Sequence, residues 1–200
     1  MNFDNFIDSS HNFLEPLLKE FTSAKLIGKN DIIDHICYKP KLFSEYEVLK
    51  KLIINANNQL LSEVIINGRP IATYKLKTAI NRSGFTIDYL ELAAPKLGHH
   101  KESAWDHIEV VVKSTLKEFR SKNSHHKWNS SNIDSKLNPD ISLKLASGIV
   151  KFHTSPLSKI INTEKILSRN KNKDKAIFFD LDGTITVSYT HLTLPTICSV

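Results

Sequence analysis

The chain has 200 residues, of which 40% are hydrophobic, and carries a formal net charge of +6. This length suits one domain of ordinary size, or one domain and a fragment of another. No apolar run approaches the ~20 residues that a membrane-spanning helix needs, and the first residues lack the pattern of a signal peptide. Cys37 and Cys198 are the two cysteines, so we expect no disulfide framework and a reducing compartment such as the cytoplasm.

Much of the positive charge lies in one polar stretch without aromatic residues, which contains Lys165, Arg169, Lys171, Lys173 and Lys175. Nucleic-acid sites usually combine basic residues with aromatic or structured surfaces. The stretch is more typical of a solvated linker. We therefore expect neither a nucleic acid nor a membrane as partner, and the sequence leaves the oligomeric state open.

The first half of the chain indicates helices and then a mixed unit. Apolar residues recur at helical spacing from Phe3 to Phe21 with a break at Ser9-Ser10, which predicts one or two helices packed outside the next domain. Pro16 fits a first helical turn, and Gly28 can end the helix. The following pattern predicts strands at 32–39, 60–66, 69–76 and 84–92, a helix at 43–56, and a hairpin turn at Asn67-Gly68.

The second half repeats this order less clearly. Residues 106–113 are typical of a strand and 114–120 of a short helix, whereas residues 121–138 show no regular pattern. Residues 141–146 and 148–153 then predict a hairpin, and 158–167 a closing helix.

A three-residue word occurs twice, as Asp34-His35-Ile36 and as Asp106-His107-Ile108. Period-two alternation puts His107 and Glu109 on one face of their strand and Asp106 on the other. A buried strand that offers an imidazole and a carboxylate together is a candidate ligand or acid–base surface. The repetition predicts a duplicated module with a His near the start of each first strand.

This unit of a strand, a helix and three strands, found twice, resembles the vicinal oxygen chelate superfamily, and within it the chain is similar to the YecM-like family. The matching words follow in order over residues 30–160: Asp34-His35-Ile36, Asn67-Gly68-Arg69-Pro70-Ile71, Glu91-Leu92 with Pro95, Trp105-Asp106-His107-Ile108-Glu109, Asn138-Pro139 and Lys151-Phe152-His153. The resemblance implies an α+β fold in which two βαβββ modules form one vicinal oxygen chelate-type cup, preceded by the N-terminal helix or helices. It implies no particular reaction.

In metal-dependent members of the superfamily, ligands come from the first and last strands of each module, which here carry His35, Glu91, His107 and His153. Imidazoles with a carboxylate suit a divalent ion such as zinc, nickel, manganese or iron. Counted back from Pro95 and Pro156, Glu91 and His153 differ by one position, so Glu109 is the alternative fourth ligand. A single His is more often a structural residue, and the prediction therefore depends on the four strands together.

Three cations are candidate substrate-binding residues. Arg69 and Lys75 share one face of the strand that follows the Asn67-Gly68 turn, and Lys151 shares a face with His153. Together they can receive an anionic substrate. An exposed strand edge explains Arg69 and Lys75 equally well.

Residues 176–184 carry a second resemblance. An apolar strand followed by Asp180-Leu181-Asp182-Gly183-Thr184 is similar to the first motif of haloacid-dehalogenase-type phosphatases. That motif implies Asp180 as nucleophile and Asp182 as general acid–base, with Mg²⁺ between carboxylates in a complete domain. Only sixteen residues follow Thr184, too few for the remaining parallel strands, so we expect no phosphatase activity from this chain.

Residues 187–200 have neither a helical period nor a continued strand pattern, and they are similar to the translation of a transposase-type sequencing adapter. The expected organisation is a helical segment at 1–29, a vicinal oxygen chelate-like domain at 30–165, a linker at 166–175, a truncated haloacid-dehalogenase-like start at 176–186, and the adapter-derived tail at 187–200.

Three functions fit these residues. The first is a metal-dependent isomerase, lyase or dioxygenase, in which the ion binds neighbouring oxygens of a small molecule and Glu109 or Glu91 acts as base. The second is a non-catalytic module that binds a small oxygenated ligand in the same cup. The third makes the cup an accessory of the C-terminal phosphatase. Metal content separates the first from the second.

Overall fold

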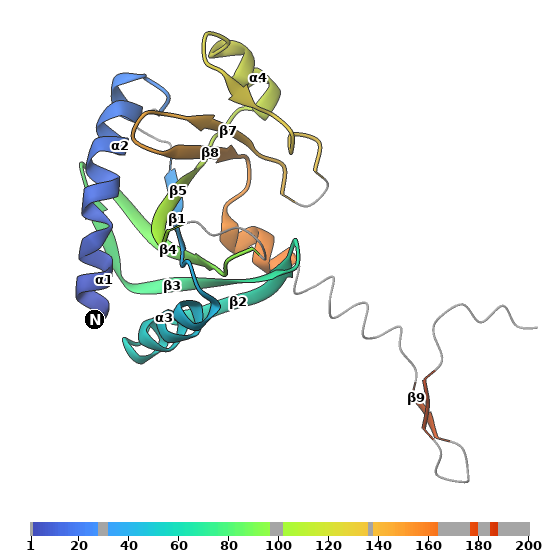
Figure 1. Ribbon diagram of the computed structural model, residues 1–200. Helices are drawn as coiled ribbons and strands as arrows, with labels where there is room; N and C mark the ends of the chain where they lie inside the picture. Colours follow the sequence, from blue (N-terminus) through green and yellow to red (C-terminus); the bar gives the residue numbers. More distant parts are fainter. Residues whose placement is uncertain are drawn as a thin grey trace, which may run out of the picture. The chain divides into compact units, whose positions relative to one another are not determined.

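The computed structural model describes residues 2–27, 32–96, 102–135 and 138–163, together with the backbone of residues 177–179 and 185–187. The chain divides into two compact units, Met1–Ile160 and Ile161–Val200. The first unit contains the N-terminal helices and both predicted modules (Figure 1). The domain boundaries given above stay predictions.

The first module has the predicted order of one strand, one helix and three strands. Its elements are β1 (Ile32–Lys39), α3 (Phe43–Asn55), β2 (Gln59–Ile66), β3 (Arg69–Arg82) and β4 (Phe85–Ala93). The apolar face of α3 buries Tyr46, Leu49 and Ile53 at helical spacing.

The second module has the same order with shorter elements. They are β5 (Ala104–Val111), α4 (Leu116–Lys122), β6 (Trp128–Asn129), β7 (Ile141–Lys144) and β8 (Ile149–His153). α4 starts two residues later than predicted, because Thr115 and Glu118 form a capping box that fixes its N-terminus. β6 lies in the stretch where the sequence showed no pattern.

The strands form one eight-stranded sheet in the order β2-β3-β4-β1-β5-β8-β7-β6. β1 pairs with β4 in parallel and β5 pairs with β8 in parallel, while β1 and β5 run antiparallel at the centre with Ile36 opposite Ile108. This order is symmetric about the β1–β5 pair, so the two modules are related by an approximate two-fold axis. The predicted α+β fold, with two βαβββ modules joined in one sheet and preceded by N-terminal helices, is confirmed.

Both hairpins of the first module turn at two consecutive residues with positive φ. Asn67 (φ 52°) and Gly68 (φ 76°) form the predicted turn. Ser83 (φ 49°) and Gly84 (φ 82°) form another, which lets β3 continue to Arg82. The sequence predicted the end of this strand at residue 76, because residues 77–82 lack a regular apolar alternation.

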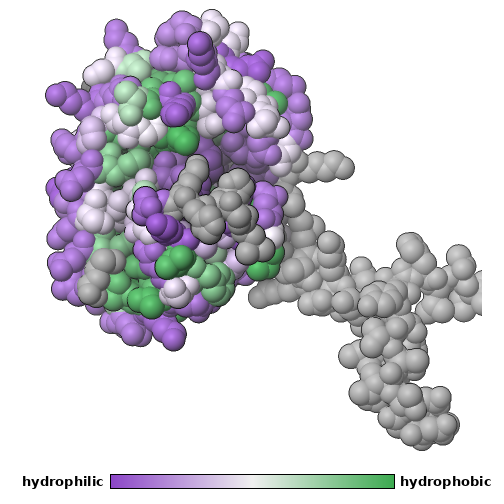
Figure 2. Space-filling view, in the orientation of Figure 1, coloured by the Kyte–Doolittle hydropathy of each residue, from purple (hydrophilic) through white to green (hydrophobic). Residues whose placement is uncertain are grey.

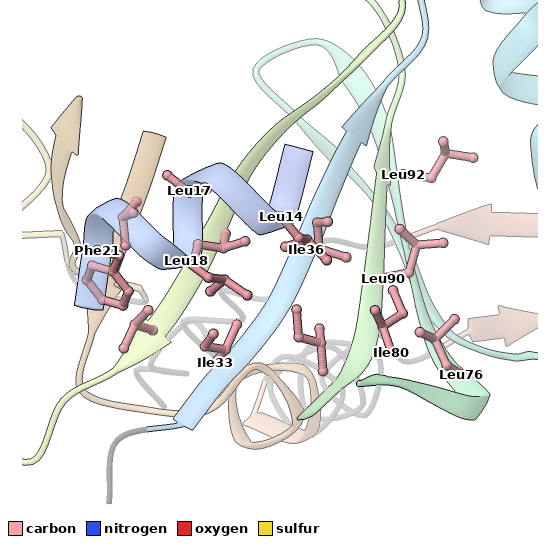
Figure 3. Close-up of a cluster of buried hydrophobic side chains, with 14 of the residues drawn as sticks. Leu14, Leu17, Leu18, Phe21, Ile33, Ile36, Leu76, Ile80, Leu90 and Leu92 are labelled. Carbon is pink, nitrogen blue, oxygen red and sulfur yellow. The ribbon is translucent and has the colours of Figure 1, made fainter. Parts of the chain in front are cut away.

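Two N-terminal helices, α1 (Phe3–Ser9) and α2 (His11–Ser23), supply much of the core. The break predicted at Ser9-Ser10 is confirmed. Pro16, however, is the sixth residue of α2 and not part of a first turn. Figure 3 shows α2 across the strands, and its fully buried side chains are Leu14, Leu17, Leu18 and Phe21.

α2 contacts both modules. The Glu20 carboxylate accepts hydrogen bonds from the backbone N–H groups of Ala146 and Ser147, at 3.0 and 2.9 Å, in the turn between β7 and β8. At the first module, the Ser83 hydroxyl donates to the Glu15 carboxylate at 3.1 Å. Helix α2 therefore packs on the apolar face of the sheet and connects its two halves.

In the first module, helix α3 and strand β2 expose apolar side chains to solvent. Figure 2 shows apolar side chains in the lower part of the visible face, where Figure 1 places α3 and β2. Val48 of α3 and Ile65 of β2 have exposed fractions of 64% and 70%. None of the described helices is long and apolar enough to cross a membrane.

Past β8, residues 157–163 are helical, which agrees with the start of the predicted closing helix. In the second unit, β9 (Ile177–Phe179) pairs with β10 (Ile185–Val187) in an antiparallel two-stranded sheet. The apolar strand predicted before Asp180 is therefore present at residues 177–179, and residues 185–187, for which the sequence predicted no strand, supply its partner. Asp180, Asp182 and residues 188–200 lie outside the described residues.

Candidate metal centre

Two Asp-His pairs, one on β1 and one on β5, lie at the centre of the sheet. The register of these strands shifts at two places, leaving Asp34 without a partner on β5 and Asp106 without a partner on β1. Such β-bulges redirect a side chain to the other face of the sheet. The carboxylate of Asp106 therefore lies beside His107, and the prediction that alternation separates them is wrong.

In each pair the Asp fixes the imidazole of the next residue. Asp34 Oδ2 lies 3.1 Å from His35 Nδ1, and Asp106 Oδ2 lies 2.7 Å from His107 Nδ1. A carboxylate only accepts, so Nδ1 carries the proton and donates it. The Nε2 atoms are thereby left available as acceptors or metal ligands.

Both Nε2 atoms lie near one oxygen of Glu109. Glu109 Oε1 is 3.5 Å from His35 Nε2 and 3.1 Å from His107 Nε2. The three side chains are almost completely buried, and His35 Nε2 has no hydrogen-bond partner among the described residues. A buried polar atom of this kind calls for a ligand.

Lys151 also lies against Glu109, with its Nζ 2.8 Å from the same Oε1. Burial by itself would raise the pKa of Glu109, but the charges of His35 and Lys151 outweigh burial and hold that pKa well below its usual range. Burial likewise opposes the charged form of His35, yet Glu109 and Asp34 raise its pKa to about 10. The carboxylates of the site therefore strongly favour positively charged groups beside them.

Glu91 and Lys151 occupy equivalent positions in the two modules. Glu91 lies opposite Cys37, and Lys151 lies opposite Glu109, while Cys37 and Glu109 each follow the site His by two residues. Glu91 Oε2 is 4.0 Å from His35 Nε2. The offset of one position between Glu91 and His153 is thus wrong, since β8 places His153 two residues beyond the counterpart of Glu91.

His153 reaches the other side of the cluster. Its Nε2 lies 3.7 Å from Asp34 Oδ2 and 3.8 Å from Glu109 Oε2, and burial lowers its pKa. Neither ring nitrogen has a hydrogen-bond partner among the described residues. Asp34 is already engaged there, because it also accepts a hydrogen bond from the N–H of Leu157 at 2.9 Å.

The donor atoms fit a divalent ion. The ligand atoms of His35, His107 and Glu109 all lie within 4.8 Å of one another, and those of Cys37, Glu91 and His107 form an overlapping group. Ligands of a tetrahedral ion with bonds of ~2.0–2.1 Å are about 3.3 Å apart, close to the separations from Glu109 to the two imidazoles. The structure thus brings together His35, Glu91 and His107, with Glu109 nearer to the imidazoles than Glu91.

The three predicted substrate-binding cations are separated. Lys151 lies in the cluster, whereas Lys75 is exposed on β3. Arg69 lines a pocket of about 300 Å³ at the end of the sheet. The sequence missed Asp34 and Asp106 as partners of the site imidazoles, although the repeated Asp-His-Ile word was a signal that both residues of the pair matter.

The comparison with protein families matches the YecM protein family over residues 2–164. The chain belongs to the YecM family. The match covers the N-terminal helices and both modules, and it stops before the residues that resemble a phosphatase motif.

Two curated relatives match parts of this chain. Protein YecM of Escherichia coli (strain K12) is 37% identical over 54 residues, which are 27% of this chain and 29% of that protein. An uncharacterized protein of Haemophilus influenzae is 30% identical over 97 residues, or 48% and 47% of the two chains. The aligned segments therefore span less than half of either relative.

Among solved structures, Structural Genomics, Protein EC4020 is similar with a TM-score of 0.67 and 20% identity, covering 80% of this chain and 92% of that one. A Streptomyces coelicolor methylmalonyl-CoA epimerase in complex with 2-nitronate-propionyl-CoA gives a TM-score of 0.45 at 13% identity, covering 62% and 96%. At such identities a likeness concerns the fold alone. These comparisons give no support to the haloacid-dehalogenase resemblance.

Proposed function

We propose that this protein binds one divalent metal ion through His35, His107 and Glu109, with Glu91 beside them, and that the ion holds a small oxygenated molecule in the cup. The observation that carries the proposal is the pair of buried imidazoles. Each has its Nδ1 occupied by the preceding Asp, and both Nε2 atoms face one carboxylate oxygen. Imidazoles oriented by carboxylates in this way are typical of metal sites.

The charge around the site supports the same proposal. Four carboxylates, those of Asp34, Glu91, Asp106 and Glu109, face the two ammonium groups of Lys39 and Lys151. An imidazole that binds a metal is neutral, so in the metal-bound site these groups leave two negative charges in a largely buried region. A divalent cation neutralises both, and uncompensated buried charge is costly.

When bound, a divalent ion supplies Lewis acidity to the oxygens of its ligand, which suits isomerase, lyase or dioxygenase chemistry. The sequence left Glu109 and Glu91 open as the base. The lowered pKa of Glu109 makes it a weak base, and its position suits a metal ligand. Glu91 is more accessible, with 16% of its side chain exposed, and lies 4.0 Å from His35 Nε2. We therefore assign the acid–base role to Glu91.

Lys151 favours a second candidate function, a non-catalytic cup that binds an oxygenated ligand without a metal. Its ammonium occupies the position equivalent to Glu91 and contacts Glu109 directly. A positive charge inside the site can hold an anionic or polar ligand by itself. Metal content separates this candidate from the first.

The test is a titration of the full chain, purified without a His tag and stripped with a chelator, with Zn²⁺, Mn²⁺, Ni²⁺ and Fe²⁺. We expect one ion per chain, and His35→Ala or His107→Ala should weaken binding by more than ~100-fold, since loss of an outer partner alone costs ~10–100-fold. His11→Ala, on α2, is the matched control. Binding that does not saturate, or that ignores both substitutions, would favour the metal-independent cup.

A further inference from the structure

A second concave site lies at one end of the sheet. The pocket of about 300 Å³ lies where β1 and β4 end and where β3 and β5 begin, and it is lined in part by Lys39, Pro40, Arg69, Pro95 and Asp106. A volume of this size accommodates several non-hydrogen atoms, since a water molecule takes ~30 Å³ in the liquid. The pocket therefore has room for part of a small molecule.

The pocket carries positive charge that its own carboxylates do not neutralise. Asp106 is paired with Lys39 at 2.6 Å, and Glu102 is paired with Lys41 at 2.7 Å. Arg69 and Lys96 also line the pocket, and neither forms an ion pair with any described residue. Two cations thus remain for an outside anion.

Arg69 is held in place for such a role. Its Nη1 donates a hydrogen bond to the backbone carbonyl of Ala94 at 2.8 Å, while its buried Nε has no hydrogen-bond partner among the described residues. A guanidinium anchored through one nitrogen keeps its other donors in a fixed plane. Planar, fixed donors match the two oxygens of a carboxylate or phosphate.

The pocket adjoins the candidate metal centre on the same sheet face. Lys39 follows His35 and Cys37 at two-residue steps along β1, so all three side chains share one face. At ~3.3 Å per residue, Lys39 is about 7 Å from Cys37 and about 13 Å from His35 along the strand. Asp106 links the two sites, because it lines the pocket and bonds His107 Nδ1.

We propose that this pocket binds the anionic end, a carboxylate or phosphate, of the molecule whose other oxygens reach the metal centre. The part of this inference that concerns the metal centre rests on the proposed function. It defines the ligand as an elongated organic acid or phosphoester, with about 7–13 Å between its anionic group and its metal-binding oxygens. Arg69 and Lys96 bind the anion, while Lys39 remains paired with Asp106.

The test is anion binding to the chelator-stripped full chain, measured by calorimetric titration with inorganic phosphate and with glutarate. We expect saturable binding of at least one anion, weakened about tenfold or more by Arg69→Met, because charged hydrogen bonds are lost. Arg69→Lys should bind with intermediate affinity. Lys75→Met, an exposed cation on the same strand face, is the matched control and should leave affinity unchanged. The preferred anion distinguishes a carboxylate ligand from a phosphate ligand.

A metal titration of each variant separates this inference from the proposed function. Unchanged metal affinity in Arg69→Met shows that the variant is folded and that the lost anion binding is local. Arg69-dependent anion binding in a protein that takes up no metal would support the pocket and overturn the metal centre. Anion binding that is absent from the parent chain, or equal in Arg69→Met, would overturn the pocket.

Discussion

The two modules are alike in their first strands and different in their last. β1 and β5 each carry an Asp at a bulge, then a His whose Nδ1 bonds that Asp. β4 and β8 differ at equivalent positions, which hold Glu91 and Lys151. Each module still contributes one Glu to the cup, but the first takes Glu91 from its last strand and the second takes Glu109 from its first strand. The imidazole pair is therefore symmetric, and the charge around it is not.

The scaffolds differ as well. β2 and β3 have 8 and 14 residues, whereas β6 and β7 have 2 and 4. The short hairpin of the second module is supported by α2, which accepts hydrogen bonds from its turn through Glu20 and packs Phe21 against Phe152 with ring centroids 5.8 Å apart. Helix α2 thus gives the second module contacts that longer strands give the first.

Removing the charge that distinguishes β8 should have the largest effect. Lys151→Met leaves Glu109 buried without its ammonium partner, which should destabilise the chain by about 2–3 kcal/mol, less than for a fully buried pair because Lys151 is partly exposed. The same change should raise metal affinity about tenfold, since a competing cation is removed. Urea unfolding and a metal titration measure the two effects, with Lys75→Met as control. Weaker metal binding would show that Lys151 helps to build the site.

The turns of the two modules should respond differently to an added methyl group. At Gly148, between β7 and β8, a Cβ would lie 2.9 Å from Phe13 Cε2, while at Gly84 it meets nothing within 4 Å. Gly148→Ala should therefore cost about 2 kcal/mol through overpacking and strain, and Gly84→Ala about 1 kcal/mol through backbone strain alone. Denaturant unfolding compares them. Equal losses would argue that α2 does not hold the second hairpin tightly.

The equivalence of the two Asp-His pairs can be broken by truncating each Asp. Asp34→Ala and Asp106→Ala should each weaken metal binding ~10–100-fold, because the imidazole loses the group that fixes it. Each change also removes one further contact, the N–H of Leu157 for Asp34 and the ammonium of Lys39 for Asp106, so each should cost about 1 kcal/mol in stability. Titration and unfolding of both variants measure this. If Asp106→Ala alone affects the metal, the site is asymmetric at its first strands too.

The smallest expected effect concerns Glu20 and pH. Hydrogen bonds from the backbone of Ala146, then from Ser147, lower the pKa of Glu20 below 4.5. Because the folded pKa lies below the unfolded one, the stabilisation is present above pH 4.5 and is lost as the pH falls through the folded pKa. Glu20→Gln should therefore reduce stability by less than ~1 kcal/mol at neutral pH, and the difference should vanish in acid. A difference that persists at pH 3 would mean that packing, and not the charge, is responsible.

The sequence by itself determined the architecture. Alternation marked the buried strands, Asn67-Gly68 marked the first hairpin, and the repeated Asp-His-Ile word identified the two equivalent first strands. These features depend on local backbone preferences and on apolar periodicity, which a single chain segment carries within itself. Residues 121–138 were unclear for the same reason, because the two-residue β6 is too short to show a period.

Tertiary structure alone decided which side chains meet in the cup. A bulge arises from the pairing of two strands, so no pattern within β5 showed that Asp106 would turn towards His107. The pairing of β8 with β5 likewise put Lys151 opposite Glu109 and His153 opposite Val111. The register of two strands that are distant in sequence is a property of the pair, so the residues of one strand do not reveal it. The pocket at Arg69 was hidden for the same physical reason, since its walls come from four strands that are distant in sequence and adjacent only in the folded sheet.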